Sequence, residues 1–182
     1  MNGSTSLVKR VGRMDKRALI RAYDKYAPAI YRYAYRLTGH EGTAQDVTSE
    51  TYYRLLRSVR NGGGPTDNLS AWLYRVAHNL VVDSYRRQPD KAPVPLAQAP
   101  DLSVAGRQEA RLEHQERMVR ARSALRKLTP LQQQVINLRF LEGLSIKETA
   151  EIMGKTQGAV KALQHRATNS MRRILEETDE EE

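Results

Sequence analysis

The sequence predicts an all-α protein built from two small helical domains joined by a proline-rich linker. Apolar residues recur every three or four positions along almost every periodic segment, whereas β-branched residues are sparse and no alternation is sustained. One stretch interrupts this texture, because residues 88–106 hold four of the seven prolines. A chain of 182 residues has room for two such domains.

The first domain is expected over residues 16–87, as three helices. Residues 16–38 form an amphipathic helix that ends at Gly39, since a left-handed cap favours glycine. Its expected apolar stripe is Leu19, Tyr23, Tyr26, Ile30, Tyr33 and Leu37. Thr43 caps a second helix, residues 44–60, which buries Val47, Thr51, Leu55 and Val59. The segment NGGGPTDN, residues 61–68, ends it, and Ser70 begins a third helix running to about Arg87.

Residues 88–106 read as a semi-rigid linker, and the second domain follows over residues 107–175. It opens with a charged helix, residues 107–128. Thr129, Pro130 and Gln132 then predict a capped helix over residues 130–141. Ser145 and Glu148 form a second capping box for a short helix that ends at Met153.

The turn GKT and the cap Thr156 lead into a last helix, which runs to about Leu175. Two helices joined by a three-residue turn that contains glycine, with the small Ala150 on the first, indicate a helix-turn-helix.

The net charge of +9 understates how basic the two domains are. Six of the 21 acidic residues lie in the tail EETDEEE, residues 176–182, so residues 1–175 hold 30 basic side chains against 15 acidic ones. This balance indicates a polyanionic partner. The tail is interpreted as a disordered, solubilising end, and a competing hypothesis lets it cover the basic face of its own domain.

Several function classes are excluded by composition. The chain has no cysteine, so it has no disulfide, thiolate metal site or cysteine nucleophile, and it fits a reducing compartment. The four histidines are too scattered for a metal-binding motif, and no catalytic motif or phosphate-binding loop is present. We therefore expect no enzyme activity, metal or cofactor. Without a membrane-length apolar run or a secretion signal, a cytoplasmic protein is expected, with no membrane insertion.

The last helix carries the clearest binding signal. Val160, Leu163, Ala167 and Met171 gather on one side as core. The opposite side holds small, amide and cationic residues suited to a major groove: Gly158, Lys161, Ala162, His165, Arg166 and Asn169. DNA binding is favoured over a merely solvated face, because caps, turn and charge agree.

A second cationic face follows the third helix. Arg75, Asn79, Val82 and Arg86 fall on one stripe, with His78 beside it, opposite a buried set of Leu73, Val76, Ala77 and Leu80. Such a face fits a nucleic-acid strand, although a basic face is more often only solvated. Trp72, Tyr74 and Tyr85 are candidates for base stacking, and a core role is the favoured interpretation for them.

Asp46 and Glu50 lie one helical turn apart, where two like charges cost a few tenths of a kcal/mol. A basic partner surface would offset this repulsion. A place near the helix N-terminus, where the macrodipole favours acids, is the alternative, and it explains Asp46 better than Glu50.

Three segments resemble the promoter-melting domain of bacterial sigma factors of the extracytoplasmic-function group. They are YDKYAPAIYRYAYRLTGH, DVTSETYYRLLRSV and LSAWLYRVAHNLVVDSYRR. The segment LTPLQQQVINLRFLEGLSIKETAEIMGKTQGAVKALQHRA resembles the domain of that family that reads the upstream promoter element. The match covers residues 18–175 in the family's order, and the tandem is more specific than either half.

The resemblance implies a subunit that binds core RNA polymerase and opens promoter DNA. It implies that Asp46 and Glu50 dock on the clamp helices of the largest polymerase subunit. It assigns the downstream (−10) element to Asn61, Asn68, Arg75, Asn79 and Arg86, with the loop 61–68 holding a flipped base. It assigns the upstream (−35) element to Gln157, Lys161, His165 and Arg166.

The resemblance also implies that the linker threads through the polymerase, and it admits an anti-sigma factor as a further partner, since many relatives are held by one. The chain departs from the family pattern at Ser49, Leu56, Leu163 and Gln164, so no particular promoter sequence is carried over. Two rival interpretations stay open: a dimeric helix-turn-helix regulator that acts without polymerase, and an adaptor or anti-sigma protein that uses its first domain for protein contacts only.

Overall fold

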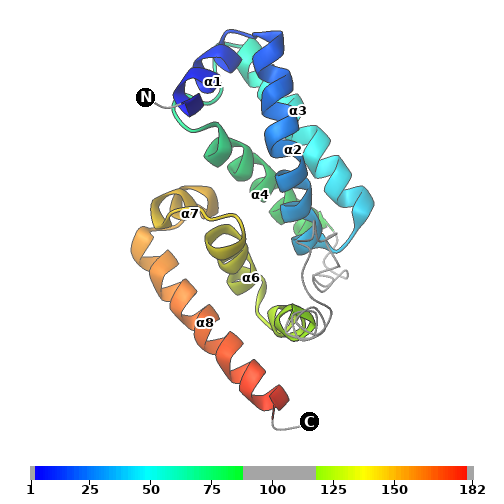
Figure 1. Ribbon diagram of the computed structural model, residues 1–182, viewed down its shortest axis with the longest axis vertical. Coiled ribbons are helices and arrows are strands. Elements are labelled where there is room, and N and C mark those ends of the chain that lie inside the picture. Colours follow the sequence, from blue (N-terminus) through cyan, green and yellow to red (C-terminus); the bar gives the residue numbers. More distant parts are fainter. Residues whose placement is uncertain (1–2, 88–117, 180–182) are drawn as a thin grey trace, which may run out of the picture.

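The computed structural model describes residues 3–87 and 118–179, and every regular element in these ranges is helical, as predicted. The upper group of helices in Figure 1 is α1 (Gly3–Gly12), α2 (Lys16–Thr38), α3 (Glu41–Arg60) and α4 (Leu69–Arg87). The lower group is α6 (Pro130–Ile136), the π-helical turn η1 (Asn137–Leu141), α7 (Ile146–Met153) and α8 (Gln157–Asp179). The predicted linker, residues 88–106, and the first half of the predicted helix 107–128 lie outside the described residues. Residues 118–126 of that predicted helix are helical.

The helix α2 begins and ends where the sequence predicts. Its N-cap, Asp15, accepts a hydrogen bond from the Ala18 amide, and Arg10 pairs with the same carboxylate at 2.9 Å. The hydrogen bond from the Ala18 amide and the contact with Arg10 hold the pKa of Asp15 below its usual value. Gly39 ends the helix with φ of 65°, in the left-handed region.

Two helices begin earlier than predicted, α3 by three residues and α4 by one. The helix α3 begins at Glu41 because the His40 ring, rather than Thr43, accepts the first free amide, that of Thr43. The helix α4 begins at Leu69 because the Asn68 side chain accepts from the Ala71 amide. Asparagine is a strong capping residue, so the cap falls two residues before Ser70.

The core of the first half lies between α2, α3 and α4. Ile30, Tyr33 and Leu37 of α2 are fully buried, as are Leu55 of α3 and Leu73 of α4. The four core positions predicted for α3 are all buried. Tyr23 was wrongly predicted to be core, because its ring is 52% exposed and packs at the surface against Tyr52. The preceding helix α1, which the sequence did not indicate, adds Val8 and Val11 to this core.

The second half has a core of its own around α8, and both predicted capping boxes are present, at Thr129–Gln132 and at Ser145–Glu148. The predicted helix 130–141 is α-helical only to Ile136. Its last turn is π-helical, because the Glu142 amide bonds to the Asn137 carbonyl five residues back.

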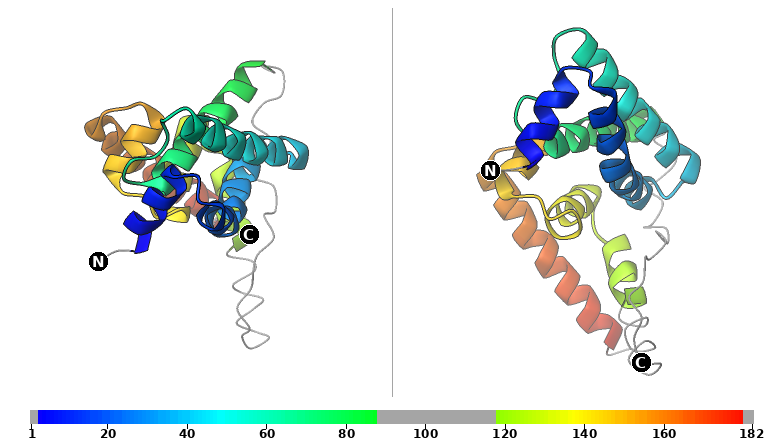
Figure 2. Two further views of the ribbon diagram at one scale, coloured as in Figure 1. Left: turned by 90° about the horizontal axis from the view of Figure 1, so that it is seen from above. Right: turned by 45° about the horizontal axis from the view of Figure 1, so that its top comes forward.

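The two halves pack against each other through α4 and α7 (Figures 1 and 2). Leu138, Leu144 and Ile152 of the second half belong to the same buried cluster as the core of the first half. The far end of α8 extends away from this contact (Figure 1). It continues to Asp179, so residues 176–179 of the tail are helical rather than disordered, and residues 180–182 lie outside the described residues.

Candidate nucleic-acid interface

The helix-turn-helix is formed by α7 and α8. Gly154 ends α7 with φ of 61°, and the Thr156 hydroxyl accepts from the Ala159 amide to begin α8. Ala150 is buried where the two helices cross, as predicted from its size. The turn therefore holds α8 at a fixed angle across α7 (Figure 1).

The face of α8 that the sequence predicts for DNA is exposed. All six predicted members lie on the surface: Gly158, Lys161, Ala162, His165, Arg166 and Asn169. Gln157, the fourth predicted upstream-element residue, is exposed at the start of the helix. On the opposite side Val160, Leu163 and Ala167 are buried, and Met171 is partly buried. Apart from the chain neighbours of Gly158 and the backbone of its own helix, no atom lies within 4 Å of where a Cβ would stand on this residue, so the backbone is open to close approach there.

A bond that the sequence did not indicate fixes α8 against η1. Arg139 Nε donates to Gln164 Oε1 at 2.9 Å, and another nitrogen of the same guanidinium donates to the Leu144 carbonyl. Gln164 is one of the positions at which the chain departs from the resembled family. In this chain the residue serves the packing of α8, and only the placement of Arg139 across the fold could have indicated that.

The face of α4 is only partly as predicted. Arg75, Asn79 and Arg86 are exposed. The Nη1 atom of Arg86 lies 4.0 Å from Oδ1 of Asp83. His78 was wrongly placed beside this face. It is 5% exposed, and its Nδ1 shares a hydrogen bond of 2.9 Å with the Tyr33 hydroxyl. Burial lowers the pKa of His78 to about 4, so the ring is neutral near pH 7.

The aromatic residues of α4 are mainly structural, as the favoured interpretation held. Tyr74 is buried, and its hydroxyl donates to Glu142. Burial raises the pKa of this phenol, with the Glu142 charge as a second cause, so the hydroxyl remains a donor. Tyr85 donates to the Leu37 carbonyl. Trp72 is partly buried and lines a cavity beside the loop 61–68.

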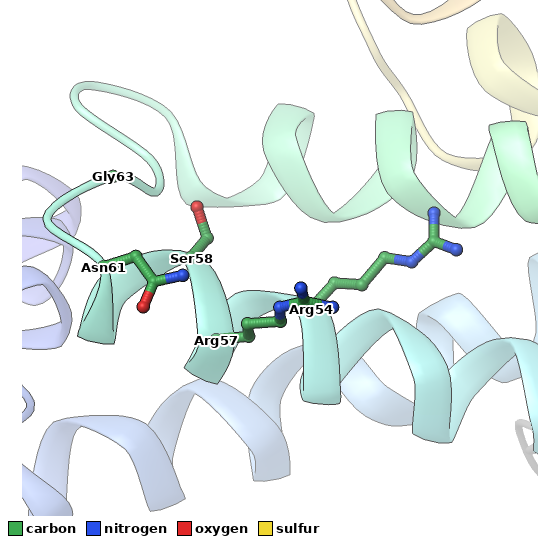
Figure 3. Close-up of a pocket in the computed structure, with 5 residues that line it drawn as sticks. All are labelled: Arg54, Arg57, Ser58, Asn61 and Gly63. Carbon is green, nitrogen blue, oxygen red and sulfur yellow. The ribbon is translucent and has the colours of Figure 1, made fainter.

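The loop 61–68 borders two separate hollows, and its two asparagines do not share one. A cavity of about 200 Å³ is lined by loop residues Gly64 to Asn68, by Trp72 and Arg75 of α4, and by Glu151 and Ile152 of α7. An open hollow of about 290 Å³ lies on the other side, at the end of α3. Asn61, Arg54, Arg57, Ser58 and Gly63 line it, and Ser58 points toward the loop (Figure 3).

The structure thus brings Asn68 and Arg75 together in the first hollow and places Asn61 in the second. The sequence did not single out Arg54 and Arg57. Their spacing of three residues on a predicted helix makes them neighbours on one face, and this is the signal that could have indicated the pair.

The acidic pair on α3 is at the surface, but its two members differ. Asp46 is exposed. Glu50 accepts a hydrogen bond from Arg54 Nε at 2.8 Å, four residues along the helix. The repulsion between Asp46 and Glu50 is therefore already partly offset within the free chain, and not only in a complex.

Comparisons with known proteins match each half separately. A model for Sigma-70 region 2 matches residues 22–89, and one for Sigma-70 region 4 matches residues 124–173. The chain is 37% identical to the ECF RNA polymerase sigma factor BldN of Streptomyces coelicolor over 93% of its own length and 64% of that relative. It is 32% identical to the ECF RNA polymerase sigma factor SigL of Mycobacterium tuberculosis, over 88% of this chain and 90% of SigL.

The chain belongs to the ECF group of RNA polymerase sigma factors.

Its fold is shared with a solved sigma factor. The sigma factor RpoE of Bartonella quintana, solved in complex with the anti-sigma factor NepR, superposes with a TM-score of 0.62 at 22% identity, covering 88% of this chain and 96% of that one. This sigma factor spans slightly less than two thirds of BldN. Among its described residues, no helix is long and apolar enough to cross a membrane, and no group of acidic or histidine side chains could hold a metal ion.

Proposed function

We propose that this sigma factor binds core RNA polymerase, recognises the downstream and upstream promoter elements and promotes DNA opening. The tandem order of region 2 and region 4 in one chain is the observation that carries the proposal. A lone helix-turn-helix occurs in many regulators, whereas a promoter-melting domain ahead of it is specific to initiation.

The faces of α8 and α4 are proposed to bind different promoter elements. Gln157, Lys161, His165 and Arg166 offer donors from α8 to base edges and phosphates of the upstream element. Arg75, Asn79 and Arg86 of α4, with the loop from Asn61 to Asn68, face the downstream strand. Opening the duplex costs a few kcal/mol for each extracted base, which binding of the separated strand and of polymerase must supply.

The proposed role needs no active site in this chain. RNA synthesis belongs to the polymerase, and the sigma factor contributes binding and position only. Since bacterial transcription takes place in the cytoplasm, the proposal places the protein there. An anti-sigma factor is a further proposed partner, supported by the NepR complex of the RpoE relative.

Asp46 and Glu50 are proposed to dock on basic residues of the polymerase clamp helices. Asp46 is exposed and Glu50 is partly exposed. With Arg54 and Arg57 on the following turn, α3 has an acidic half and a basic half. Opposite charges across such a contact raise the rate of encounter and fix its register.

The double variant Asp46→Arg/Glu50→Arg tests this contact. We expect it to capture at least tenfold less core polymerase than the wild type in a pull-down, because two attractive pairs become repulsive. Glu176→Arg/Glu177→Arg, on the far part of α8, is the charge-matched control and should bind normally. Equal capture by all three proteins, with unchanged thermal unfolding, would contradict the assignment. Tight salt-sensitive binding of a palindrome by a dimer, without polymerase, would instead favour the rival regulator.

A further inference from the structure

The turn between α1 and α2 and the last turns of α3 carry a dense group of cations. Residues 3–23 and 51–66 hold nine lysines and arginines against one acidic residue, Asp15. This acid is already paired, because its carboxylate lies 2.9 Å from Arg10 Nη2. We define the basic end as five exposed members of the group: Arg13, Lys16, Arg17, Arg57 and Arg60.

The two parts of the basic end meet because α2 and α3 pack side by side in opposite directions. The Tyr52 hydroxyl donates to the Ala22 carbonyl at 3.2 Å, and the rings of Tyr23 and Tyr52 have centroids 4.8 Å apart. With these residues level, the first turn of α2 lies beside the last turns of α3. Figures 1 and 2 show the α1–α2 turn and the end of α3 at the same end of the first half.

Helix stability does not explain the cations at the start of α2. Lys16 and Arg17 occupy its first turn, which holds no acidic residue. The macrodipole disfavours cations at a helix N-terminus and favours them at a C-terminus, where Arg57 and Arg60 lie. Lys16 and Arg17 therefore destabilise their own helix, and an anionic partner would offset this cost.

The basic end borders the loop 61–68, to which the proposed function assigns a flipped base. Arg60 directly precedes Asn61, the first residue of the loop. Arg57 and Asn61 line the same open hollow (Figure 3). The cationic face of α4 follows the loop on its other side. The loop thus lies between two cationic surfaces, and only that of α4 has a proposed ligand.

We propose that the basic end binds the sugar–phosphate backbone of the separated downstream strand next to the loop 61–68. Four of its five members are arginines, whose planar guanidinium can bind two phosphate oxygens at once. Such contacts position a strand without reading its sequence. The inference rests on the proposed function, since it extends the path of the same strand. Residues 3–21 lie outside the match to Sigma-70 region 2, so that match does not assign this contact.

The basic end is already formed in the free chain. Val8 and Val11 of α1 are buried against the first half, and they hold the helix in place. The turn after α1 is fixed by backbone hydrogen bonds from Met14 to Val11 and from Asp15 to Arg10. The cations therefore need no polymerase to come together, and strand binding can be measured on the full chain alone.

The salt dependence of binding to a random-sequence DNA single strand tests the contact. Arg13→Gln/Lys16→Gln/Arg17→Gln removes three charges and leaves the pair of Arg10 and Asp15 intact. Each phosphate neutralised on a single strand contributes about 0.7 to the slope of log affinity against log salt. We therefore expect the slope to become shallower by about 2 and the affinity at low salt to fall about tenfold.

The charge-matched control is Lys127→Gln/Arg172→Gln/Arg173→Gln, at exposed positions of the second half. It should keep the slope and affinity of the wild type, and thermal unfolding should show that both variants are folded. Equal slopes in the two triple variants would overturn the proposal.

A variant of α3 makes the test independent of the start of α2. Arg57→Gln/Arg60→Gln should make the slope shallower by about 1. If only this variant loses affinity, the α1–α2 turn takes no part and the proposal is overturned. The triple variant at the basic end is also tested on phosphatidylglycerol vesicles. Loss of vesicle binding with an unchanged slope on DNA would assign the basic end to a lipid surface and overturn the proposal.

Transcription with core polymerase separates this inference from the proposed function. If the wild type directs new start sites while the triple variant at the basic end binds the strand like its control, the inference fails and the proposed function stands. If strand binding falls as expected but the wild type starts no transcript, the basic end binds DNA backbone and the proposed function fails.

Discussion

His78, which was predicted to lie beside the cationic face of α4, is buried and forms a hydrogen bond with the Tyr33 hydroxyl. The imidazole of His78 is buried between α2 and α4. This burial disfavours the charged form and lowers the pKa of the ring to about 4. Burial also raises the pKa of the Tyr33 hydroxyl. Both groups are thus neutral in the folded protein over the physiological range, and they join the two helices.

This depressed pKa predicts a loss of stability in mild acid. In the unfolded chain His78 gains a proton near pH 6.5, whereas in the folded chain it does so only near pH 4. The unfolded state therefore binds more protons between these values, and the free energy of unfolding falls as pH drops through this window. From pH 7 to pH 5 the fall from this residue is about 2 kcal/mol.

Urea unfolding of the wild type and of His78→Gln at pH 7 and pH 5 measures the effect. Glutamine can still bond to the Tyr33 hydroxyl but does not titrate, so we expect the variant to lose most of the fall. His165→Gln, at an exposed position, is the matched control and should retain it. A variant at position 78 with the full wild-type fall would contradict a neutral buried ring.

The ion pair between Glu50 and Arg54 positions a surface carboxylate and adds little stability. It lies on the surface, with both side chains more than 40% exposed, and so contributes only a few tenths of a kcal/mol. Its importance is that it leaves Glu50 ordered on the helix without burying it. The carboxylate therefore remains available to a partner.

At the level of elements, helix α8 carries its core contacts on one side and its proposed DNA contacts on the other. Its buried side is aliphatic and its exposed side begins with Gly158, which no neighbour constrains. Glycine near a helix end lowers helix stability, and no packing contact requires it here, so its presence agrees with the proposed close approach of DNA.

Substitution of Gly158 therefore has opposite effects on stability and binding. Gly158→Ala should raise the free energy of unfolding by about 0.5 kcal/mol, because the backbone entropy of glycine is removed. Gly158→Leu should remain folded and lose roughly tenfold in affinity for a duplex selected by the wild type from a random pool, because a side chain blocks close approach. Ser123→Leu, at an exposed position of the segment 118–126, is the control. Unchanged duplex affinity in Gly158→Leu would assign that face to solvent.

Most helix ends with local causes could be predicted from the sequence, although the local caps His40 and Asn68 were missed, and contacts with distant causes could not be predicted. The capping boxes at Thr129 and Ser145, and the caps at Gly39 and Thr156, depend on residues within three or four positions, and all four are present. Burial of His78 depends on Tyr33, 45 residues away. The role of Gln164 depends on Arg139, 25 residues away.

In the candidate site too, features determined by one helix could be predicted, and features determined by distant residues could not. Helical periodicity identified the exposed face of α8 because one helix determines it. Periodicity alone placed His78 on the face of α4, whereas the packing of a second helix buries it. The bond from Asn68 to Glu148 joins residues 80 positions apart, so no local pattern indicated that a predicted strand contact is already occupied.

For the whole molecule, the order of the domains could be predicted and their packing could not. Segments of the sequence resemble the two family domains, but nothing in them indicates that α4 lies on α7 or that Glu142 bonds to Arg36 and Tyr74. Helix α1 was missed for a related reason. Its ten residues are short for a stable isolated helix, and it is held by burial of Val8 and Val11 against the first half.

If this chain is an initiation subunit, it should direct core polymerase to new start sites in reconstituted transcription. Purified core polymerase is supplied with a pool of genomic fragments, with and without the full chain, and the 5′ ends of the transcripts are mapped. We expect a small set of new start sites that share two sequence elements and are absent with core polymerase alone. An unchanged pattern of start sites on adding the chain, in a reaction where a known sigma factor redirects the same polymerase, would contradict it.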